Sequence, residues 1–316
     1  MRAIHVSAPA RLHLGFVDLN GSLGRKYGSI GLAVDTPATR LVVREAETFT
    51  ATGTEAARAE KAARRFSGLY APDRAFAVAV EEAIPAHAGL GSGTQLALAI
   101  GAAILKLAGH SASAHLLGEV VERGARSAIG ITAFEHGGFI VDGGRGTSSH
   151  PPPTVVRLDF PEEWRAILVL DPREAGVHGE KETAAFQALP EFPESLAGHL
   201  CRLTLMRLLP GVVEHDLEAF GEALSEIQSI VGAHFAAAQG GAPWSNPAVG
   251  RIVARLRDAG ANGVGQSSWG PTGFAFVSNV AAADRLYSSL VEEAKAEGLE
   301  LKIVQGRNTG AILGPA

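Results

Sequence analysis

The sequence is poor in cysteine, in aromatic residues and in long apolar runs. Its single cysteine, Cys201, excludes a disulfide within the chain and any metal site built from several cysteines. No run approaches the roughly 18 apolar residues that a membrane span needs, and the first residues lack the apolar core of a secretory signal. We therefore expect a cytoplasmic protein with no membrane partner.

The sequence also lacks a large excess of either positive or negative charge. The chain carries 28 lysines and arginines against 33 aspartates and glutamates, for a formal net charge of −5, and has no basic block. This balance argues against a nucleic-acid partner, which requires a basic surface. An anionic substrate would have to be held by local donors, because the overall charge does not attract it.

Glycine, by contrast, is in excess. The 316 residues include 38 glycines, which is about 12% of the chain against a usual ~7%. The glycines gather in a few loops and follow no collagen period. Since a glycine allows a sharp turn or a close approach of the backbone to a ligand, we expect function in these loops.

The length is about twice the ~150 residues of a typical domain. We predict two lobes, residues 1–150 and 151–316, separated near the polar, proline-rich segment 148–153. The order of elements predicts an α+β fold with mixed or antiparallel sheets and helices on one face. Strands are expected at 3–7, 11–17, 29–34, 39–44, 75–81, 139–141, 155–158, 166–170, 274–278 and 300–304, and helices at 54–69, 95–107, 112–128, 181–188, 194–209, 213–237, 247–259 and 280–296.

The sharpest feature is a glycine loop that runs into the apolar helix predicted at 95–107. Free backbone N–H groups and the positive end of the helix dipole favour a phosphate at such a place. No Gly-Lys-Ser/Thr follows, so the loop is not a Walker loop, and its spacing is not that of a dinucleotide fingerprint. A tight structural turn is the alternative. The loop consists of Gly89, Leu90, Gly91, Ser92, Gly93 and Thr94.

A second group of polar residues lies near the amino terminus. Alternation along the predicted strand 11–17 places Arg11 and His13 on one face. The loop after that strand offers Asp18, Asn20, Arg25 and Lys26, of which the two cations could clamp a phosphate or carboxylate. A solvated hairpin tip explains Arg25 and Lys26 equally well.

Three further segments are candidates. Glu135 and His136 could act as an acid–base or metal-binding pair, although such dipeptides often arise by chance. His178 lies in a charged run after a predicted strand, which is more typical of a solvated surface. The glycine-rich loop 263–273 holds Ser268, Trp269 and Gly270, and a tryptophan in such a loop is poorly explained as core filling.

These segments together resemble the GHMP kinase superfamily, and most closely its branch of β-ribofuranosylaminobenzene 5′-phosphate synthases. The glycine loop is specific only to the superfamily, and the strings Asp-Leu-Asn-Gly, Ala-Phe-Glu-His-Gly-Gly and Trp-Gly-Pro-Thr select the branch. The resemblance extends from residue 9 to about 277 and rests on Asp18-Leu19-Asn20-Gly21, Gly89-Leu90-Gly91-Ser92, Ala133-Phe134-Glu135-His136-Gly137-Gly138, Val177-His178-Gly179-Glu180 and Ser267-Ser268-Trp269-Gly270-Pro271-Thr272.

The resemblance implies a two-lobe GHMP-type fold and a magnesium-dependent reaction of 5-phosphoribosyl 1-diphosphate with 4-aminobenzoate or 4-hydroxybenzoate. This reaction releases CO2 and diphosphate early in tetrahydromethanopterin biosynthesis, and the family suggests a homodimer. As expected roles, Asp18 and Glu135 with Ser92 bind Mg2+ or stabilise the developing cation, with His136 beside them. Arg11 or Arg25 would orient the carboxylate, and Phe134 or Trp269 would stack on the ring.

Two other activities remain open. An ATP-dependent small-molecule kinase of the same fold is the main one, and a ligand sensor without turnover is the other. In an ungapped comparison, Gly130 stands where such kinases commonly carry an aspartate, eight residues before the glycine pair that ends at Gly138. A glycine cannot take a proton, which argues against phosphoryl transfer by that mechanism, unless a gap moves Glu135 into the role.

Overall fold

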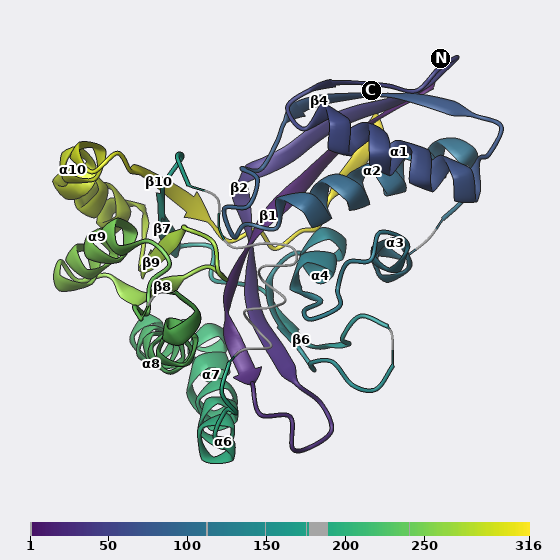
Figure 1. The fold of residues 1–316 in the computed structure, drawn as a ribbon. Coiled ribbons are helices and arrows are strands. Elements are labelled where there is room, and N and C mark those ends of the chain that lie inside the picture. Colours follow the sequence, from purple (N-terminus) through teal and green to yellow (C-terminus); the bar gives the residue numbers. More distant parts are fainter. Residues whose placement is uncertain (1, 112, 149, 175, 177–188, 240) are drawn as a thin grey trace.

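The computed structural model describes residues 2–111, 113–148, 150–174, 176, 189–239 and 241–316. The chain forms two lobes, each built on its own β-sheet (Figure 1). The predicted helix at 181–188 lies outside the described residues. Helices cover both sheets, and the sheets are antiparallel apart from one parallel pair, β3 with β4. The expected α+β, two-lobe class is therefore confirmed.

The larger sheet has seven strands, in the order β11-β1-β2-β4-β3, with β5 joining β2 to β6. Two long strands dominate it and extend toward the smaller lobe, where the lower half of their hairpin lies beside α6 and α7 (Figure 1). The strands are β1 (Ala3–Asp18), β2 (Tyr27–Ala46), β3 (Thr50–Gly53), β4 (Ala75–Glu82), β5 (Phe139–Asp142), β6 (Thr154–Leu158) and β11 (Ile312–Pro315).

The long strands replace four short ones expected from the sequence. Pro9 and Pro37 suggested breaks, because a proline lacks the N–H that a strand ladder uses. Both strands continue past these residues, with a register shift between Pro9 and Ala10 and no partner in β1 for residues 35–37. A bulge absorbs the prolines, so that each pair of predicted segments forms one strand.

Helices α1 (Ala56–Tyr70) and α2 (Ser92–Ala108) cover one face of the larger sheet (Figure 1). Glycine at position 101 of α2 lets the ring of Phe66 from α1 pack against the helix backbone, since a Cβ there would lie 2.5–2.7 Å from ring atoms. The predicted helix 112–128 is shorter: α3 spans Ala114–Val120. A second short helix, α4 (Ile129–Glu135), follows it and was not predicted.

The smaller sheet has the order β10-β7-β9-β8. Helices α9 and α10 cover one face, and the other face shares an apolar core with α8 and with β1, β2 and β5 of the larger sheet. One continuous apolar cluster therefore connects the two lobes. The elements are β7 (Arg165–Leu170), β8 (Asn262–Gln266), β9 (Gly273–Val277), β10 (Glu300–Gln305), α8 (Leu217–Phe235), the 3-10 turn η2 (Ala236–Gln239), α9 (Pro247–Asp258) and α10 (Val280–Ala296).

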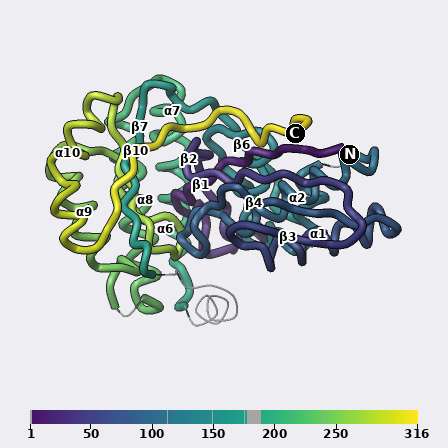
Figure 2. The backbone as a smooth tube through the Cα atoms, turned by 90° about the horizontal axis from the view of Figure 1, so that it is seen from above, coloured from purple at the N-terminus to yellow at the C-terminus, as the bar shows by residue number. Residues whose placement is uncertain are grey.

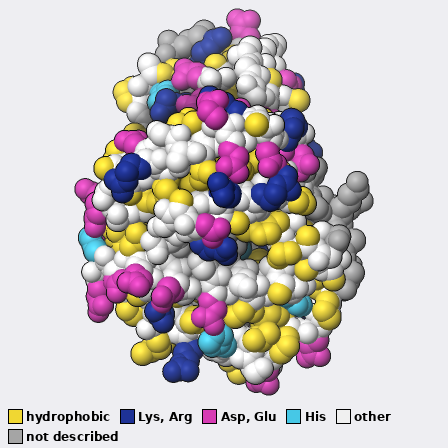
Figure 3. Space-filling model, turned by 90° about the vertical axis from the view of Figure 1, so that its left-hand side faces the viewer, with side chains coloured by type: hydrophobic (Ala, Val, Ile, Leu, Met, Phe, Trp, Pro, Cys, Tyr) yellow, Lys and Arg dark blue, Asp and Glu magenta, His cyan; other side chains and the backbone are white. Residues whose placement is uncertain are grey.

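The outer face of this lobe carries acidic and basic side chains interspersed with one another (Figure 3). Arg251 on α9 forms an ion pair with Glu297, just after α10, and Arg255 lies 3.5 Å from Glu293. Such exposed pairs contribute little stability individually. Their even mixture of signs gives this face no single-sign patch.

The segment Glu194–Val213 is helical throughout, as α6 (Glu194–Leu203), the π-helical turn η1 (Thr204–Leu208) and α7 (Leu209–Val213). By length and composition it could cross a membrane, because it contains an 18-residue window with a mean hydropathy of 1.2, of which 33% is buried in the fold. A core helix of a water-soluble protein meets the same criterion. Here the segment packs on α8 and β1, and Leu200, Leu208 and Val212 are buried there.

The first and last strands lie side by side in the larger sheet. β11 pairs with the first residues of β1, and the N–H of Ala316 donates to the carbonyl of Ala3. Both termini therefore lie at one end of the larger sheet (Figure 2). The predicted boundary at residues 150–151 falls between β5 and β6, which pair with each other, so the larger sheet draws strands from both sides of it.

Candidate active site

The glycine loop forms the amino end of α2. Gly91 is the N-cap residue, with a left-handed φ of +83°, and provides no side-chain cap for the helix. Helix geometry leaves the first N–H groups, among them those of Ser92 and Gly93, without intrahelical acceptors. The positive end of the helix dipole and these donors make the loop suited to a phosphate.

Residues 267–272, after β8, hold this loop in place. The Ser267 hydroxyl accepts from the N–H of His13 at 3.0 Å and donates to the carbonyl of Gly89 at 2.7 Å. Thr272 donates through Oγ1 to the carbonyl of Ala88 at 2.6 Å. Gly89 has a φ of +81°, and a Cβ there would overlap the carbonyl oxygen of Ser267. The glycine is therefore required by both conformation and contact.

Arg11 brings a cation to the same loop. Its Nη1 donates to the carbonyl of Gly89 at 2.5 Å, and its backbone N–H donates to the carbonyl of Leu90 at 3.1 Å. A Cβ on Gly91 would be 3.1 Å from Cγ of Arg11. The guanidinium thus lies against the loop backbone, where it strengthens the attraction for an anion.

His13 stands next to this cation on β1 and is 5% exposed. Burial, together with the charges of Arg11 and Arg126, lowers the pKa of its imidazole to about 3. The ring is therefore neutral at physiological pH, and it contacts Phe16 with ring centroids 4.6 Å apart. A neutral imidazole can accept or donate a hydrogen bond but adds no charge to the site.

An aromatic-lined cavity of about 560 Å3 opens beside His13, between β1, α8 and the loop after β8. Phe16, Phe235 and Trp269 line it, with centroid distances of 5.9 Å between the phenylalanines and 5.0 Å from Phe235 to Trp269. Gln266 adds a polar network, accepting from Ser245 and donating to Gln239. Trp269 is 5% exposed and belongs to the core cluster as well as to this wall. The cavity suits a planar apolar ligand with polar ends.

Gly130, at the start of α4, faces the glycine loop. A Cβ there would lie 3.3 Å from Cγ2 of Thr94, and its carbonyl accepts from Nε2 of Gln95 at 2.7 Å. The start of α4 is held by Asp142, which accepts from the N–H groups of Ala128 and Ser29. Burial raises the pKa of Asp142, while these hydrogen bonds lower it. Gly130 and the neutral side-chain amide of Gln95 thus occupy this side of the glycine loop.

Four predicted site residues lie on the β1–β2 hairpin and have contacts within it or with its neighbours. Asp18 accepts from the N–H groups of Asn20 and Gly21, and the Asn20 side chain donates to the carbonyl of Phe192. Arg25 donates to the carbonyls of Gly143 and Gly144, and Lys26 pairs through its backbone with Arg145. These contacts order the hairpin, and the side chains of Asp18 and Arg25 make hydrogen bonds to backbone groups.

Glu135, His136 and Phe134 lie away from the loop. Glu135 and Phe134 line a separate hollow beside Ala102 and Lys106 of α2. From Ser92 to Ala102 the helix rises about 15 Å. The carboxylate of Glu135 is 3.6 Å from His115 and 3.7 Å from His136. Phe134 is 6% exposed and packs in the core of the larger lobe.

The expected magnesium ligands do not come together in this arrangement. Ser92 begins α2, whereas Glu135, at the end of α4, lies beside Ala102 and Lys106, about 15 Å farther along α2. Ligands of one Mg2+ each lie about 2.1 Å from the ion. Asp18 is engaged with the hairpin backbone. Within the described ranges, no group of three or more His, Cys, Asp or Glu side chains is arranged to hold a metal ion. These three residues do not fit a shared metal site.

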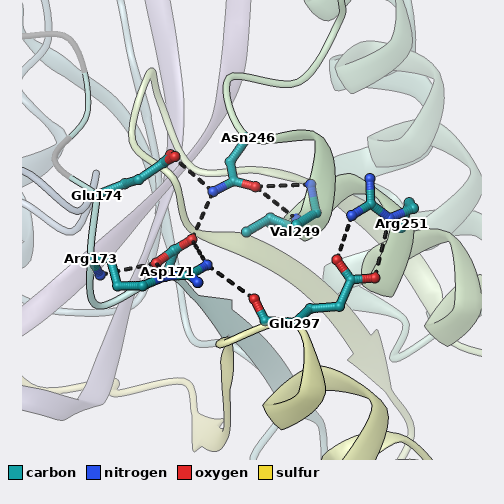
Figure 4. A network of polar contacts seen from close by, with 8 residues as sticks. Asp171, Arg173, Glu174, Asn246, Val249, Arg251 and Glu297 are labelled. Carbon is teal, nitrogen blue, oxygen red and sulfur yellow. Dashed lines mark hydrogen bonds and ion pairs between the residues drawn. The ribbon is translucent and has the colours of Figure 1, made fainter.

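The charged run after β7 is anchored to the smaller lobe (Figure 4). Asp171 accepts two hydrogen bonds from the Arg173 guanidinium, at 2.9 and 2.7 Å, and these lower the pKa of Asp171 to about 2. Asn246 caps α9 and donates to Asp171 and Glu174. The described part of this run is thus a structural network, and His178 lies outside the described residues.

The sequence predicts that Ser268, Trp269 and Gly270 are site residues. It does not predict this for their neighbours Ser267 and Thr272. In the structure these two hydroxyls make the hydrogen bonds that fix the glycine loop. Gly270 lies against Gly89, and Ser268 and Trp269 line the cavity. A hydroxyl next to a glycine was visible in the sequence, but the loop to which it bonds is about 180 residues away.

Comparison with known proteins accounts for this architecture. The family models for the GHMP kinase N-terminal domain and C-terminal domain match residues 56–138 and 208–296. A curated protein of Methanothermobacter thermautotrophicus, named β-ribofuranosylphenol 5′-phosphate synthase, is 34% identical over 98% of both chains. The chain belongs to this synthase family of the GHMP kinase superfamily. The relative of the same name in Archaeoglobus fulgidus is 34% identical over 97% of this chain and 98% of its own.

Solved structures share the fold at low sequence identity. Homoserine kinase from Cytophaga hutchinsonii has a TM-score of 0.70 and 19% identity, covering 99% of this chain and 97% of its own. A mevalonate 5-diphosphate decarboxylase has a TM-score of 0.67 and 14% identity, with the same two coverages. At such identities the likeness shows the fold alone.

Proposed function

We propose that the protein joins the ribose of 5-phosphoribosyl 1-diphosphate to the ring of a para-substituted benzoate, as a pentosyltransferase of the cytoplasm. Relatives that match nearly the whole chain are named for a β-ribofuranosylphenol 5′-phosphate product. The observation in this structure that carries the proposal is the segment 267–270, which both fixes the glycine loop and lines the aromatic cavity. A site for phosphate and a site for an aromatic ring therefore adjoin.

The glycine loop would hold the diphosphate. As the bond from C1 of ribose to the diphosphate oxygen breaks, the sugar gains positive charge and the leaving group gains negative charge. N–H groups at the start of α2 and the guanidinium of Arg11 stabilise that negative charge. Because both are fixed by the fold, little reorganisation is required during the reaction.

The acceptor ring would lie in the cavity walled by Phe16, Phe235 and Trp269. The ring carbon that bears the carboxylate attacks C1, assisted by the lone pair of the para substituent. A C–C bond forms as the bond to diphosphate breaks. Loss of CO2 then returns its bonding electrons to the ring and restores aromaticity. This scheme needs no nucleophile from the protein, in keeping with a site built on backbone donors and aromatic walls.

Mg2+ remains part of the proposal as an ion that accompanies the diphosphate. Magnesium commonly keeps several waters and binds through substrate phosphates with one or two carboxylates. A cluster of protein ligands is therefore not a requirement. The Ser92 hydroxyl, at the start of α2, is the predicted ligand nearest the proposed diphosphate.

The test is an assay with 5-phosphoribosyl 1-diphosphate, Mg2+, and either 4-aminobenzoate or 4-hydroxybenzoate labelled in the carboxyl group. We expect labelled CO2 and diphosphate in equal amounts, and the ratio of kcat/KM values identifies the preferred acceptor. A parallel reaction without the ribosyl donor controls for other decarboxylation. Diphosphate release without CO2 would contradict the proposal.

An ATP-dependent kinase is the second candidate, because the solved neighbours include homoserine kinase. Gly130 and Gln95 argue against it, since neither can take a proton from an attacking hydroxyl. Glu135, at the end of α4, lies beside Ala102 of α2, about 15 Å from the start of that helix, which is too far from the glycine loop to replace the missing base. Formation of ADP from ATP and a small alcohol, with no CO2 from labelled benzoate, would favour the kinase.

A further inference from the structure

A second, smaller hollow opens on the other side of the glycine loop. It has a volume of about 310 Å3, at the lower end of the range for small-molecule sites. Gly93 belongs to its wall, so the hollow touches the helix start that would bind the diphosphate. Four cationic side chains line it: Arg58, Lys61, Arg65 and Arg123.

The fold gathers these four cations from two segments. Arg58, Lys61 and Arg65 follow one another at spacings of three and four residues on α1, which places them on one face of the helix. Arg123 comes from the turn after α3. A Cβ on Gly93 would overlap Nη2 of Arg58 and lie 3.1 Å from Nη2 of Arg123. Two guanidinium groups therefore lie directly against the glycine loop.

Carboxylates at this hollow are fewer than cations. Glu55 pairs with Arg58 at 2.7 Å, and Glu122, which is part of the wall, pairs with Arg65 at 2.9 Å. Among the residues that the structure describes, the four cations of the wall outnumber these two carboxylates, which leaves the hollow cationic. The Arg65–Glu122 pair is exposed and the Arg58–Glu55 pair is half-buried. Since ion pairs near the surface are weak, an entering phosphate can compete with the two carboxylates.

We infer that this hollow binds a phosphate group of the ribosyl donor, next to the part of the donor that the glycine loop holds. The inference rests on the proposed function. Arginine forks match phosphate oxygens in pairs, and the hollow offers three arginines and a lysine. The phosphate is either the one on C5 of ribose or the terminal phosphate of the diphosphate, and both are fully charged oxyanions.

This arrangement gives the hollow a role in positioning. Gly93 is shared between the two sites, so a donor bound across the loop is held at two anionic points. Where the hollow holds the C5 phosphate, the ribose lies between the two points and its rotation is restricted. Binding energy from the remote phosphate then presents C1 to the acceptor in one orientation.

The test uses three single variants, Arg58→Gln, Lys61→Gln and Arg123→Gln. Arg64→Gln is the matched control, because Arg64 is also on α1 but pairs with Glu60 and lies over the ring of Phe49. Titration calorimetry measures binding of ribose 5-phosphate and, separately, of inorganic diphosphate with Mg2+. We expect at least one probe to bind ~10-fold more weakly to the variants, with the control unchanged.

The two probes distinguish the two sources of phosphate. Weakened binding of ribose 5-phosphate alone supports the C5 phosphate, and weakened binding of diphosphate alone supports the terminal phosphate. In the assay the variants should raise KM for the donor without changing KM for the acceptor. Unchanged binding of both probes in all three variants overturns the inference, as does a wild-type protein that binds neither.

These measurements do not require turnover, so they separate the inference from the proposed function. A wild-type protein that binds ribose 5-phosphate but releases no CO2 would contradict the function and leave the phosphate site intact. Normal turnover with an unchanged donor KM in the three variants would support the function and contradict the phosphate site. Thermal unfolding of each variant checks that the fold is preserved, which we expect because the side chains are at the surface.

Discussion

His13 shows how one buried residue makes stability depend on pH. Its pKa is about 3 in the folded chain because it is buried beside Arg11 and Arg126, whereas an exposed histidine has a pKa near 6.5. Between these values the unfolded chain binds a proton that the folded chain does not. The free energy of unfolding is therefore not reduced by His13 above pH 6.5, and it falls as the pH decreases from 6.5 toward 3.

From pH 7.5 to pH 5 this effect should cost about 2 kcal/mol, at ~1.4 kcal/mol for each unit below 6.5. Urea unfolding of the wild type and of His13→Gln at the two pH values measures it. The variant keeps every other titratable group, so the difference between the two proteins isolates the imidazole. The same loss of stability in both proteins would show that His13 is not the cause.

Glu135 is the residue for which sequence and structure lead to different expectations. The sequence suggested a catalytic or metal-binding role, but the side chain lies beside His115 in a hollow about 15 Å along α2 from the glycine loop. We expect Glu135→Gln to keep kcat and the donor KM within about twofold, because a surface substitution away from the site is usually mild. Steady-state assays compare it with Arg11→Gln.

Arg11→Gln removes a cation that contacts the loop, so the donor KM should rise ~10-fold or more. A large loss of kcat in Glu135→Gln, at an unchanged free energy of unfolding, would instead place that carboxylate at the reacting centre.

At the scale of the element, helix α2 offers a matched pair of glycines. Gly89, just before the helix, and Gly109, its C-cap, have φ values of +81° and +80°. Alanine at either position should cost about 1–2 kcal/mol from backbone strain. Only at Gly89 would the new Cβ overlap the backbone of Ser267, whereas nothing lies within 4 Å at Gly109.

We therefore expect Gly109→Ala to be mildly destabilised and active, and Gly89→Ala to lose more stability and most of its affinity for the donor. Chemical unfolding and donor KM for both variants check this. Equal effects would mean that strain alone, and not the contact with Ser267, explains the glycine at position 89.

Helices with a clear apolar or amphipathic pattern were largely predictable from the sequence. The apolar, alanine-rich α2 and the amphipathic α10 agree with the predicted ranges because their patterns reflect local burial. The prolines in β1 and β2 misled the prediction, since a bulge absorbs them. Helix α4 was missed because seven residues are too few to show a helical period.

At the scale of the whole molecule, the family and the position of the glycine loop before a helix could be predicted, but the meeting of distant segments could not. Ser267 and Gly89 are joined by one hydrogen bond across the two lobes, and no local pattern specifies such a partner. The sequence contains one indication of the cationic hollow: the spacing of Arg58, Lys61 and Arg65, which places them on one face of α1. Arg123 becomes part of it only through the packing of a distant turn.

The pairing of β11 with β1 also bears on how the molecule forms during synthesis. Strand β1 leaves the ribosome well before β11, the strand that covers its outer edge, which follows about 300 residues later in the chain. Until then the backbone groups of Ile4–Ser7 on that side have no β11 to pair with, and such open edges favour association with other chains. Completion of the larger lobe therefore waits until β11 has been synthesised, after the whole smaller lobe.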